Sequence, residues 1–441
     1  MLFSRKDLTK LLVPLFFEQA LTIAVGTIDT IMVAQAGDAA VSGVSLVDSV
    51  NTLFLYFIGA MTTGGAIVLS HAIGAKDEST IQNSKKQLMW LATIVSAIFA
   101  VVTIVFRKGL LSLIFGSVTP EIMKHAQDYF LYTSISLPFL GFRNAIGANY
   151  RAFGNTKISL YVSLITNLVN VAGNAYLIFV LHMGAAGAAL ATLFSRIVGA
   201  AVMYIASNGK QSPVRVERLL QYKPDWHLIR RMLGVGIPSG FENSVFQLGR
   251  VITQSLISTL GPVAIAANAA ANSLTKLMYV PGAAVGQAMT TVVGQCMGAN
   301  EKKQAKSYAI RLVGVTYAVL AVFSLTTGVF AEPLVGMFNL TPESTRVAVN
   351  LMIFHNICVS ILHPMAFTLP NSFRAAGDVR FTMVFSMLSM LALRVGCSFL
   401  FANTLGFGVY GVWLAMTTDW LARAIMFGIR YLCGTWLTKK V

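Results

Sequence analysis

Twelve apolar runs, each close to or above the length of a bilayer crossing, constrain this chain more than any other feature. A membrane-spanning helix needs ~20 mostly apolar residues. The runs lie at roughly 11–36, 44–73, 88–106, 129–150, 158–181, 185–206, 228–260, 263–297, 308–330, 347–372, 381–402 and 408–432. Charged residues make up only 11% of the chain, too few for the surface of a soluble protein. We therefore predict an all-α polytopic membrane protein with twelve transmembrane helices.

The two halves of the chain form an internal repeat. The segment from Pro14 to Glu18 reappears as the segment from Pro238 to Glu242, at an offset of 224. Further matches at offsets of 222 to 224 are Gly37 with Gly261, Gly74-Ala75 with Gly298-Ala299, Thr119-Pro120-Glu121 with Thr341-Pro342-Glu343, Arg151-Ala152 with Arg374-Ala375, and Gly184 with Gly408. Because six crossings return the chain to the same side, we predict two parallel six-helix lobes related by a pseudo-two-fold axis along the membrane normal. The expected limits are 1–206 for the N-lobe (helices one to six), 207–227 for a cytoplasmic linker and 228–441 for the C-lobe (helices seven to twelve).

The positions of lysine and arginine predict the orientation in the membrane. With both termini in the cytoplasm, the inner segments carry 21 of these residues, and the outer segments carry four, namely Arg107, Lys108, Lys124 and Arg346. This distribution explains the formal net charge of +16 by topology and by attraction to anionic lipid. No nucleic-acid partner is needed to account for it.

Motifs for ATP-driven or enzymatic chemistry are missing from the sequence. It contains no Walker A stretch, no HExxH and no nucleophile elbow, and its four cysteines form no CxxC pair. We therefore expect neither an enzyme nor a bound cofactor. The first apolar stretch is too long for a signal peptide and is interpreted as a retained helix.

Acidic residues inside predicted spans are the first candidates for function. A charge at the centre of a span costs at least ~2.5–3.5 kcal/mol by insertion scales, so such residues face the protein interior. The embedded acids are Glu18, Asp29, Asp48, Glu242 and Asp419.

Two polar stripes indicate a cavity in the first half. The stripe on helix one consists of Glu18, Thr22 and Asp29, and the stripe on helix five consists of Asn167, Asn170 and Asn174. A carboxylate facing such a cavity can take a proton or, among amide and hydroxyl oxygens, hold Na⁺. Alternatively, the amides and hydroxyls hold the helices together, and Glu18 serves the scaffold.

The second half carries different polar groups. Glu242 and Gln247 on helix seven and His363 on helix ten form a candidate second-lobe polar site. A lone histidine in a span is either a proton carrier or a hydrogen-bonded packing residue. Asp419 and Arg423, four residues apart, are expected to form a structural ion pair.

Taken in order, several motifs resemble one known family. They are P-x-x-x-E at the start of each half, TIDTIMVAQAG in helix one, IGAKD and MGANE after helices two and eight, and RAFGNTK and RAAGDVR after helices four and ten. The chain resembles the multidrug and toxic compound extrusion (MATE) transporters of the MOP flippase superfamily over essentially its whole length. The resemblance implies an antiporter of the cell (inner) membrane that works by alternating access, exporting organic cations and amphipathic drugs in exchange for H⁺ or Na⁺.

The resemblance also implies roles for residues of the first half. The coupling aspartate of the family matches Asp29, and its fifth-helix pattern N-x-x-x-D maps onto Asn170 and Asn174. Asparagine at position 174 removes one carboxylate, which leaves Asp29, Asn170 and Asn174 as the expected ligands of any Na⁺. A family hydroxyl falls near Thr192.

In the second half, the resemblance places the acids of a C-lobe cation site near Gln247 and His363. Neither residue is an acid. This site is therefore expected to be lost or converted to proton handling, with Glu242 as the nearest carboxylate.

Two other functions fit the same general architecture. A flippase for a lipid-linked precursor would use a strongly basic cavity, and the embedded basic residues here are few. A channel would conduct ions without exchange. The expected partners are a small amphipathic or cationic substrate and the lipid bilayer, and the chain is expected to act as a monomer.

Overall fold

The computed structural model describes residues 2–116, 118–209, 212–216, 219 and 221–439. Within these ranges the regular structure is entirely helical, which confirms the predicted fold class. Part of the predicted linker lies outside the described residues, namely 210–211, 217–218 and 220. Three of the 21 lysines and arginines predicted on the inner side therefore lie outside them too: Lys210, Arg218 and Lys440.

The described helices of the first half begin and end as follows. They are α1 (Arg5–Ala34), α2 (Asp38–Ala75), α3 (Glu78–Phe115), α4 (Pro120–Ile135), α5 (Leu137–Ala152), α6 (Lys157–Asn174), the π-helical η1 (Ala175–Val180) and α7 (Gly184–Ser207). The second half begins with α8 (Trp226–Ser258). Several reach well beyond the predicted apolar runs, because polar caps such as Asp77 start them outside the membrane.

The second half repeats the pattern with more interruptions. Its elements are α9 (Pro262–Thr275), η2 (Lys276–Met278), α10 (Tyr279–Gly298), α11 (Lys302–Val329), α12 (Ala331–Gly336), α13 (Pro342–His363), η3 (Pro364–Thr368), α14 (Pro370–Ala375), α15 (Val379–Leu388), η4 (Ser389–Gly396), α16 (Cys397–Phe399), η5 (Leu400–Thr404), α17 (Gly408–Cys433) and η6 (Thr435–Thr438). Prolines mark two of the breaks, since Pro364 begins η3 and Pro370 begins α14.

Eight helical segments of the described chain are long and apolar enough to cross a membrane. The other predicted crossings are helical too, but two of them are broken. The segment 120–152 is interrupted between α4 and α5 at Ser136, just before Pro138, and the segment 262–298 is interrupted by the 3₁₀ turn η2.

The chain divides into two compact units. One consists of Ser4–Gly240, and the other of Met1–Phe3 with Phe241–Val441; we call them the N-unit and the C-unit. The division falls inside α8 because the first half of this helix packs closely on α2. A side chain at Gly64 would meet the carbonyl oxygen of Met232 at 2.7 Å. The lobe limits drawn from the polar stretch 207–227 stay a prediction.

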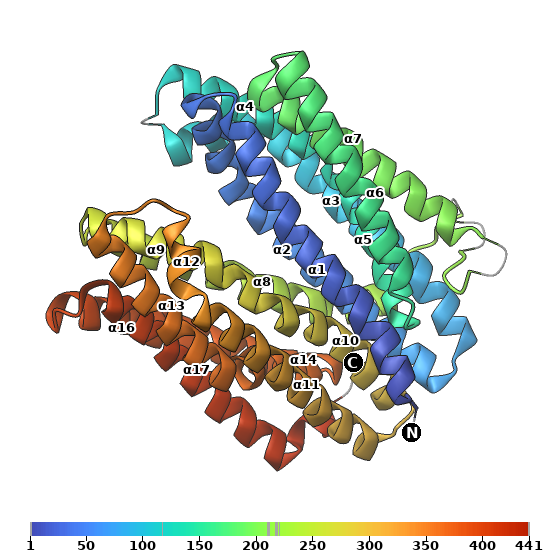
Figure 1. Cartoon of the computed structure of the whole chain (residues 1–441). Helices are drawn as coiled ribbons and strands as arrows, with labels where there is room; N and C mark the ends of the chain where they lie inside the picture. Colours follow the sequence, from blue (N-terminus) through green and yellow to red (C-terminus); the bar gives the residue numbers. More distant parts are fainter. Residues whose placement is uncertain (1, 117, 210–211, 217–218, 220, 440–441) are drawn as a thin grey trace. The chain divides into compact units, whose positions relative to one another are not determined.

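Matched backbone conformations confirm the internal repeat. Long helices lie side by side within each unit (Figure 1), and they break at equivalent positions in left-handed conformations that are uncommon for residues other than glycine. The pairs are Gly37 (φ 100°) with Gly261 (93°), Lys76 (56°) with Asn300 (59°), Gly154 (78°) with Gly377 (93°), His182 (51°) with Gly406 (72°), and Gly184 (56°) with Gly408 (55°). The two halves of the sequence therefore follow the same path through their helices.

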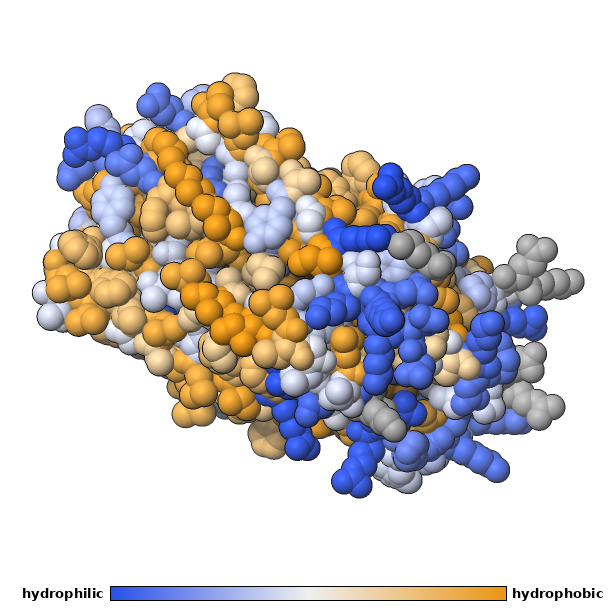
Figure 2. Space-filling model, turned by 90° about the horizontal axis from the view of Figure 1, so that it is seen from below, coloured by the Kyte–Doolittle hydropathy of each residue, from blue (hydrophilic) through white to orange (hydrophobic). Residues whose placement is uncertain are grey.

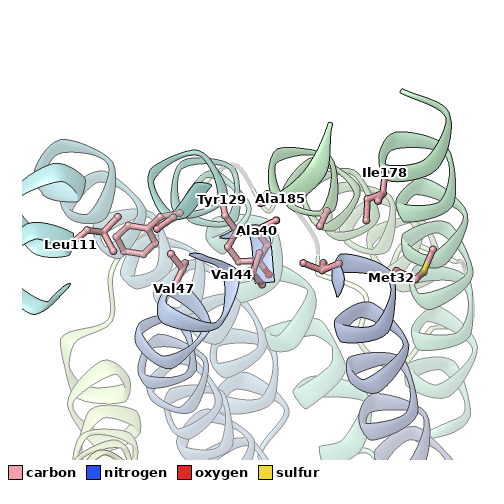
Figure 3. Close-up of a cluster of buried hydrophobic side chains, with 13 residues drawn as sticks. Met32, Ala40, Val44, Val47, Leu111, Tyr129, Ile178 and Ala185 are labelled. Carbon is pink, nitrogen blue, oxygen red and sulfur yellow. The ribbon is translucent and has the colours of Figure 1, made fainter. Parts of the chain in front are cut away.

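Apolar side chains cover both the interior and much of the surface. Hydrophobic residues occupy a broad area of the face seen in the space-filling view, and hydrophilic residues gather in separate patches on it (Figure 2). Inside the N-unit, a buried cluster joins the end of α1 to the start of α2 and to α4 and α7. Met32, Val44, Tyr129 and Ala185 belong to it (Figure 3).

The repeat also preserves one pairing of an acid with a base. In the C-unit, Arg374 Nη2 donates to Glu242 Oε1 at 2.7 Å, and only 8% of the Glu242 side chain is exposed. In the N-unit, the equivalent Glu18 interacts electrostatically with Arg151, the equivalent of Arg374. This arrangement supports the alternative reading of Glu18 and Glu242 as scaffold residues.

Breaking the C-unit ion pair is expected to destabilise the fold. Glu242→Gln leaves the half-buried Arg374 guanidinium with no carboxylate partner, so it should lower the free energy of unfolding by about 3 kcal/mol. The measurement is the midpoint of unfolding of the detergent-purified protein. The exposed Glu343→Gln, in the first turn of α13, is the control and should cost less than about 1 kcal/mol. Equal midpoints for the two variants would contradict the structural role of the pair.

Candidate functional site

Asp29 lies within reach of two amides from α6. Asn174 Nδ2 donates to Asp29 Oδ1 at 2.7 Å. The amide of Asn170 is assigned with its nitrogen toward the same carboxylate, 2.8 Å from Oδ1, because the opposite orientation would set two acceptor oxygens against each other. The predicted pairing of Asp29 with Asn170 and Asn174 is therefore present in the structure.

Thr192 on α7 completes this polar group. Its hydroxyl lies 3.4 Å from the other amide atom of Asn170, which is the oxygen in the assigned orientation, so the hydroxyl donates and the amide accepts. The Oδ1 atom of Asn174 is buried and has no hydrogen-bond partner among the described residues. A buried oxygen without a donor is available to a cation or to a protonated group.

The group opens onto a cavity of about 310 Å³ inside the N-unit. Asp29, Asn174 and Thr192 line one part of it, and apolar side chains such as Val33 and Val44 line another. Val44 and Tyr129 also belong to the buried cluster of Figure 3, so the packed core holds the cavity wall in place.

A second carboxylate, Asp48 on α2, lines the same cavity. The hydroxyl of Tyr129 donates to Asp48 Oδ1 at 3.1 Å. Arg196 on α7 also lines the cavity, interacts electrostatically with Asp48, and donates from Nη1 to the Ser136 hydroxyl at 2.7 Å. With Asp29 and Asp48 both ionised, these two carboxylates and the Arg196 guanidinium carry a net charge of one negative unit.

Two predicted members of the N-half stripes, Glu18 and Thr22, precede Asp29 by several residues along α1 and lie away from this group. Glu18 precedes Asp29 by eleven residues, about 16 Å along α1, and interacts electrostatically with Arg143 and Arg151. Thr22 is exposed, and its hydroxyl donates to the backbone carbonyl of Glu18. The Nδ2 atom of Asn167 is buried without a hydrogen-bond partner in the described part of the chain.

Among the described residues, no hydrogen bond or ion pair joins the second-lobe candidates to one another. Glu242 is held by Arg374. His363 is buried in an aromatic group, stacked on Phe367 at 5.0 Å between ring centroids and 5.6 Å from Tyr279. The expected ion pair of Asp419 with Arg423 is confirmed, at 2.8 Å.

The embedded acid Asp48 was predictable from the sequence, but its place in one cavity with Asp29, Arg196 and Tyr129 was not. The signal lay in α2, where Asp48, Asn51 and Thr52 share a polar face, and all three line the cavity. The packing of α2 against α4 and α7 decides which helix this polar face contacts. Periodicity within one helix does not show which neighbour that is.

This fold and this cavity define a multi-pass helical membrane protein with a polar cavity inside one unit. The family model MatE matches residues 14–177 and 238–400, one stretch in each half of the repeat. The chain belongs to the MatE family and is a MATE family transporter.

Comparison with individual proteins agrees with this assignment. The chain is 26% identical over 440 residues to the "Uncharacterized transporter YisQ" of Bacillus subtilis (strain 168), covering 97% of this chain and 94% of that protein. It is 25% identical over 450 residues to the "Probable multidrug resistance protein NorM" of Thermotoga maritima, covering 99% and 94%.

Solved structures share the fold. The chain is similar to the "Crystal structure of MATE in complex with MaD3S", with a TM-score of 0.92 and 18% identity, covering 98% of this chain and 96% of the other. A similar match, with a TM-score of 0.91 and 18% identity over 97% and 96%, is the "Outward-facing conformation of a multidrug resistance MATE family transporter of the MOP superfamily".

The Tyr129–Asp48 hydrogen bond can be tested by removing one hydroxyl. Tyr129→Phe keeps the ring in the buried cluster but deprives the carboxylate of its donor, so we expect the free energy of unfolding to fall by about 1 kcal/mol. Tyr132→Phe, three residues along the same helix and without a side-chain hydrogen bond among the described residues, is the matched control. Unfolding midpoints in detergent should change only for the first variant, and an unchanged midpoint there would contradict the hydrogen bond.

Proposed function

We propose that this chain is an ion-coupled antiporter that exports amphipathic compounds, organic cations among them, across the cell (inner) membrane by alternating access. The observation that carries the proposal is Asp29, a carboxylate in a membrane span held by the amides of Asn170 and Asn174 at the wall of a cavity. An embedded carboxylate is costly and marks an ion or proton pathway by default. The name of the Thermotoga maritima relative, a probable multidrug resistance protein, supports the export of drugs.

Charge balance supports one monovalent cation as the coupling ion. Asp29 and Asp48 together exceed Arg196 by one negative charge, which a single H⁺ or Na⁺ neutralises. For Na⁺, the oxygens of Asp29, Asn170 and Asn174 supply the hard ligands that the ion requires. Among the described residues, no three His, Cys, Asp or Glu side chains gather as a metal site, so amide and hydroxyl oxygens would have to contribute.

The mechanism follows from differential binding. An ion taken up at Asp29 competes with the amide hydrogen bonds from Asn170 and Asn174 and so changes how α1 packs on α6. The ion drives transport only if it binds the outward-open and inward-open states with different affinity. In the proposed cycle, ion entry from outside weakens substrate binding, the substrate leaves outward, and the protein returns to its inward-open state.

The orientation in the membrane is part of the proposal. The excess of Lys and Arg on one side, 21 against four, supports cytoplasmic termini. The protein would act as a monomer, since the cavity and its charged groups lie within a single unit of one chain.

Asp29→Asn should abolish ion-driven export. The substitution keeps the shape of the side chain but removes the charge that binds the ion, so efflux of ethidium from proteoliposomes should fall to the level of empty liposomes. Na⁺ and H⁺ gradients are imposed separately, which also identifies the coupling ion. Asp38→Asn, an exposed acid in the first turn of α2, is the control and should transport normally. Full ion-driven efflux by a folded Asp29→Asn protein would refute the assignment.

Asp48→Asn tests the charge balance. It removes the surplus negative charge of the cavity, so we expect the affinity for the coupling ion to fall at least about tenfold, since an opposite charge nearby strongly favours a bound cation. Asp48→Asn combined with Arg196→Gln returns the sum to one negative charge and should recover part of the affinity. Ion dependence of transport in proteoliposomes measures both. A double variant no better than the single one would show that net charge does not set the affinity.

A further inference from the structure

The described ion pairs of the C-unit do not include all of its embedded basic side chains. Three described ion pairs lie there: Glu242 with Arg374, Asp378 with Arg430, and Asp419 with Arg423. The remaining described acids of the C-unit, Glu301, Glu332 and Glu343, lie at helix starts or in connections. Every acid within the helical interior of this unit is therefore already paired.

Arg394 and Arg250 receive no carboxylate. Arg394 is half-buried in η4, and Arg250 is exposed on α8 eight residues before the helix ends. Neither guanidinium has a hydrogen-bond or ion-pair acceptor among the described residues. Arg394 lies close enough to both Arg250 and Arg423 to interact electrostatically with each, against the single charge of Asp419.

Two of these guanidinium groups contact the same aromatic ring. The guanidinium carbons of Arg394 and Arg423 lie 5.4 and 5.6 Å from the centroid of the same ring, that of Phe246. Arg250 follows Phe246 by four residues on α8, which places it on the same helix face. Arg423 is satisfied by Asp419 and by the backbone carbonyl of Ser386 at 2.8 Å, so Arg394 and Arg250 are the cations with free donors.

The cost of these cations argues for a ligand. An unpaired arginine within a span is expensive against lipid, so it faces the protein interior or a water-filled space and marks a functional site by default. Guanidinium is also the side chain best suited to a planar oxyanion, because its donors form a fork that binds a carboxylate through two hydrogen bonds.

The repeat shows that the charge here is reversed relative to the N-unit. At the offset of 224 that relates the flanking His182 and Gly406, Asp29 corresponds to Thr253 and Asn170 corresponds to Arg394. A carboxylate held by an amide in one half is thus replaced by a hydroxyl and a guanidinium in the other. The three arginines and one aspartate sum to two positive charges.

We propose that Arg394 and Arg250, beside Phe246, form a binding site for the oxyanion of an amphipathic aromatic substrate, a carboxylate above all. The site rests on the proposed function in that it assigns part of the substrate class to the C-unit. Phe246 and Phe367, with ring centroids 6.0 Å apart, provide apolar surface for the attached ring. The transporter would then accept aromatic carboxylates and zwitterions as well as organic cations.

The test compares three ligands that share one ring. Binding of 2-naphthoate, 2-naphthamide and 2-naphthylmethylammonium to the full-length protein in phosphatidylcholine nanodiscs is measured by calorimetry. The wild type should bind the carboxylate about tenfold more tightly than the amide, the change that one charge-assisted hydrogen bond makes. Arg394→Gln should reduce this preference to less than about threefold, and Arg394→Lys should retain part of it. The exposed Arg346→Gln, on the outer end of α13, is the control and should keep the full preference.

Several results would overturn the proposal. The proposal fails if the wild-type protein binds none of the three ligands or does not prefer naphthoate. It also fails if the Arg394→Gln and Arg250→Gln variants both keep the full preference for naphthoate. Loss of naphthoate binding on addition of phosphatidylglycerol would identify a lipid headgroup as the occupant and would also overturn it. Because no ion gradient is involved, these outcomes are independent of the loss of coupled efflux that tests Asp29.

Discussion

The cost of a charge in the bilayer is the constraint on which the rest of this structure depends. Backbone groups satisfy one another inside helices, so the chain is helical wherever it crosses the membrane. Charged side chains then need partners of their own. In the C-unit, Glu242, Asp378 and Asp419 each meet an arginine directly. In the N-unit, Asp29 meets the amides of Asn170 and Asn174 instead of an arginine, which is why we propose it as a site rather than as part of the scaffold.

Much of this organisation could be predicted from the sequence, for definite reasons. Apolar length reveals the crossings, and matching motifs reveal the repeat, which the paired left-handed residues confirm. Helical periodicity placed Asn170 and Asn174 on one face, and the structure brings both to Asp29. Periodicity could not show that Asp48 and Tyr129 border the same cavity, because that depends on how α2 packs against α4. It also joined Glu18 to Asp29 on one face although three helical turns separate them.

The repeat separates what the two halves share from what they do not. An acid and a base meet at equivalent positions in both halves, since Glu242 forms an ion pair with Arg374 and Glu18 interacts electrostatically with Arg151. A pairing kept at equivalent positions is explained by the common fold, since each half must hold its first and fourth predicted crossings together. The polar and charged side chains farther along the same helices differ between the two halves. Because the shared pairs already stabilise the helix packing, these side chains can differ without loss of the fold and are available for binding.

Opposite local charges in the two units have a physical consequence for transport. A cavity with one surplus negative charge attracts a monovalent cation, whereas a cluster with two surplus positive charges attracts an oxyanion, and each is stabilised when its ligand binds. In the proposed cycle, a protein with both sites responds to the ion at one place and to the substrate at the other. The proposed coupling needs no direct contact between the two ligands, because each would bias the same equilibrium between conformations through its own charge balance. Across the repeat, Thr253 stands at the position of Asp29 and Arg394 at the position of Asn170, and the proposed division of roles rests on this difference in sequence.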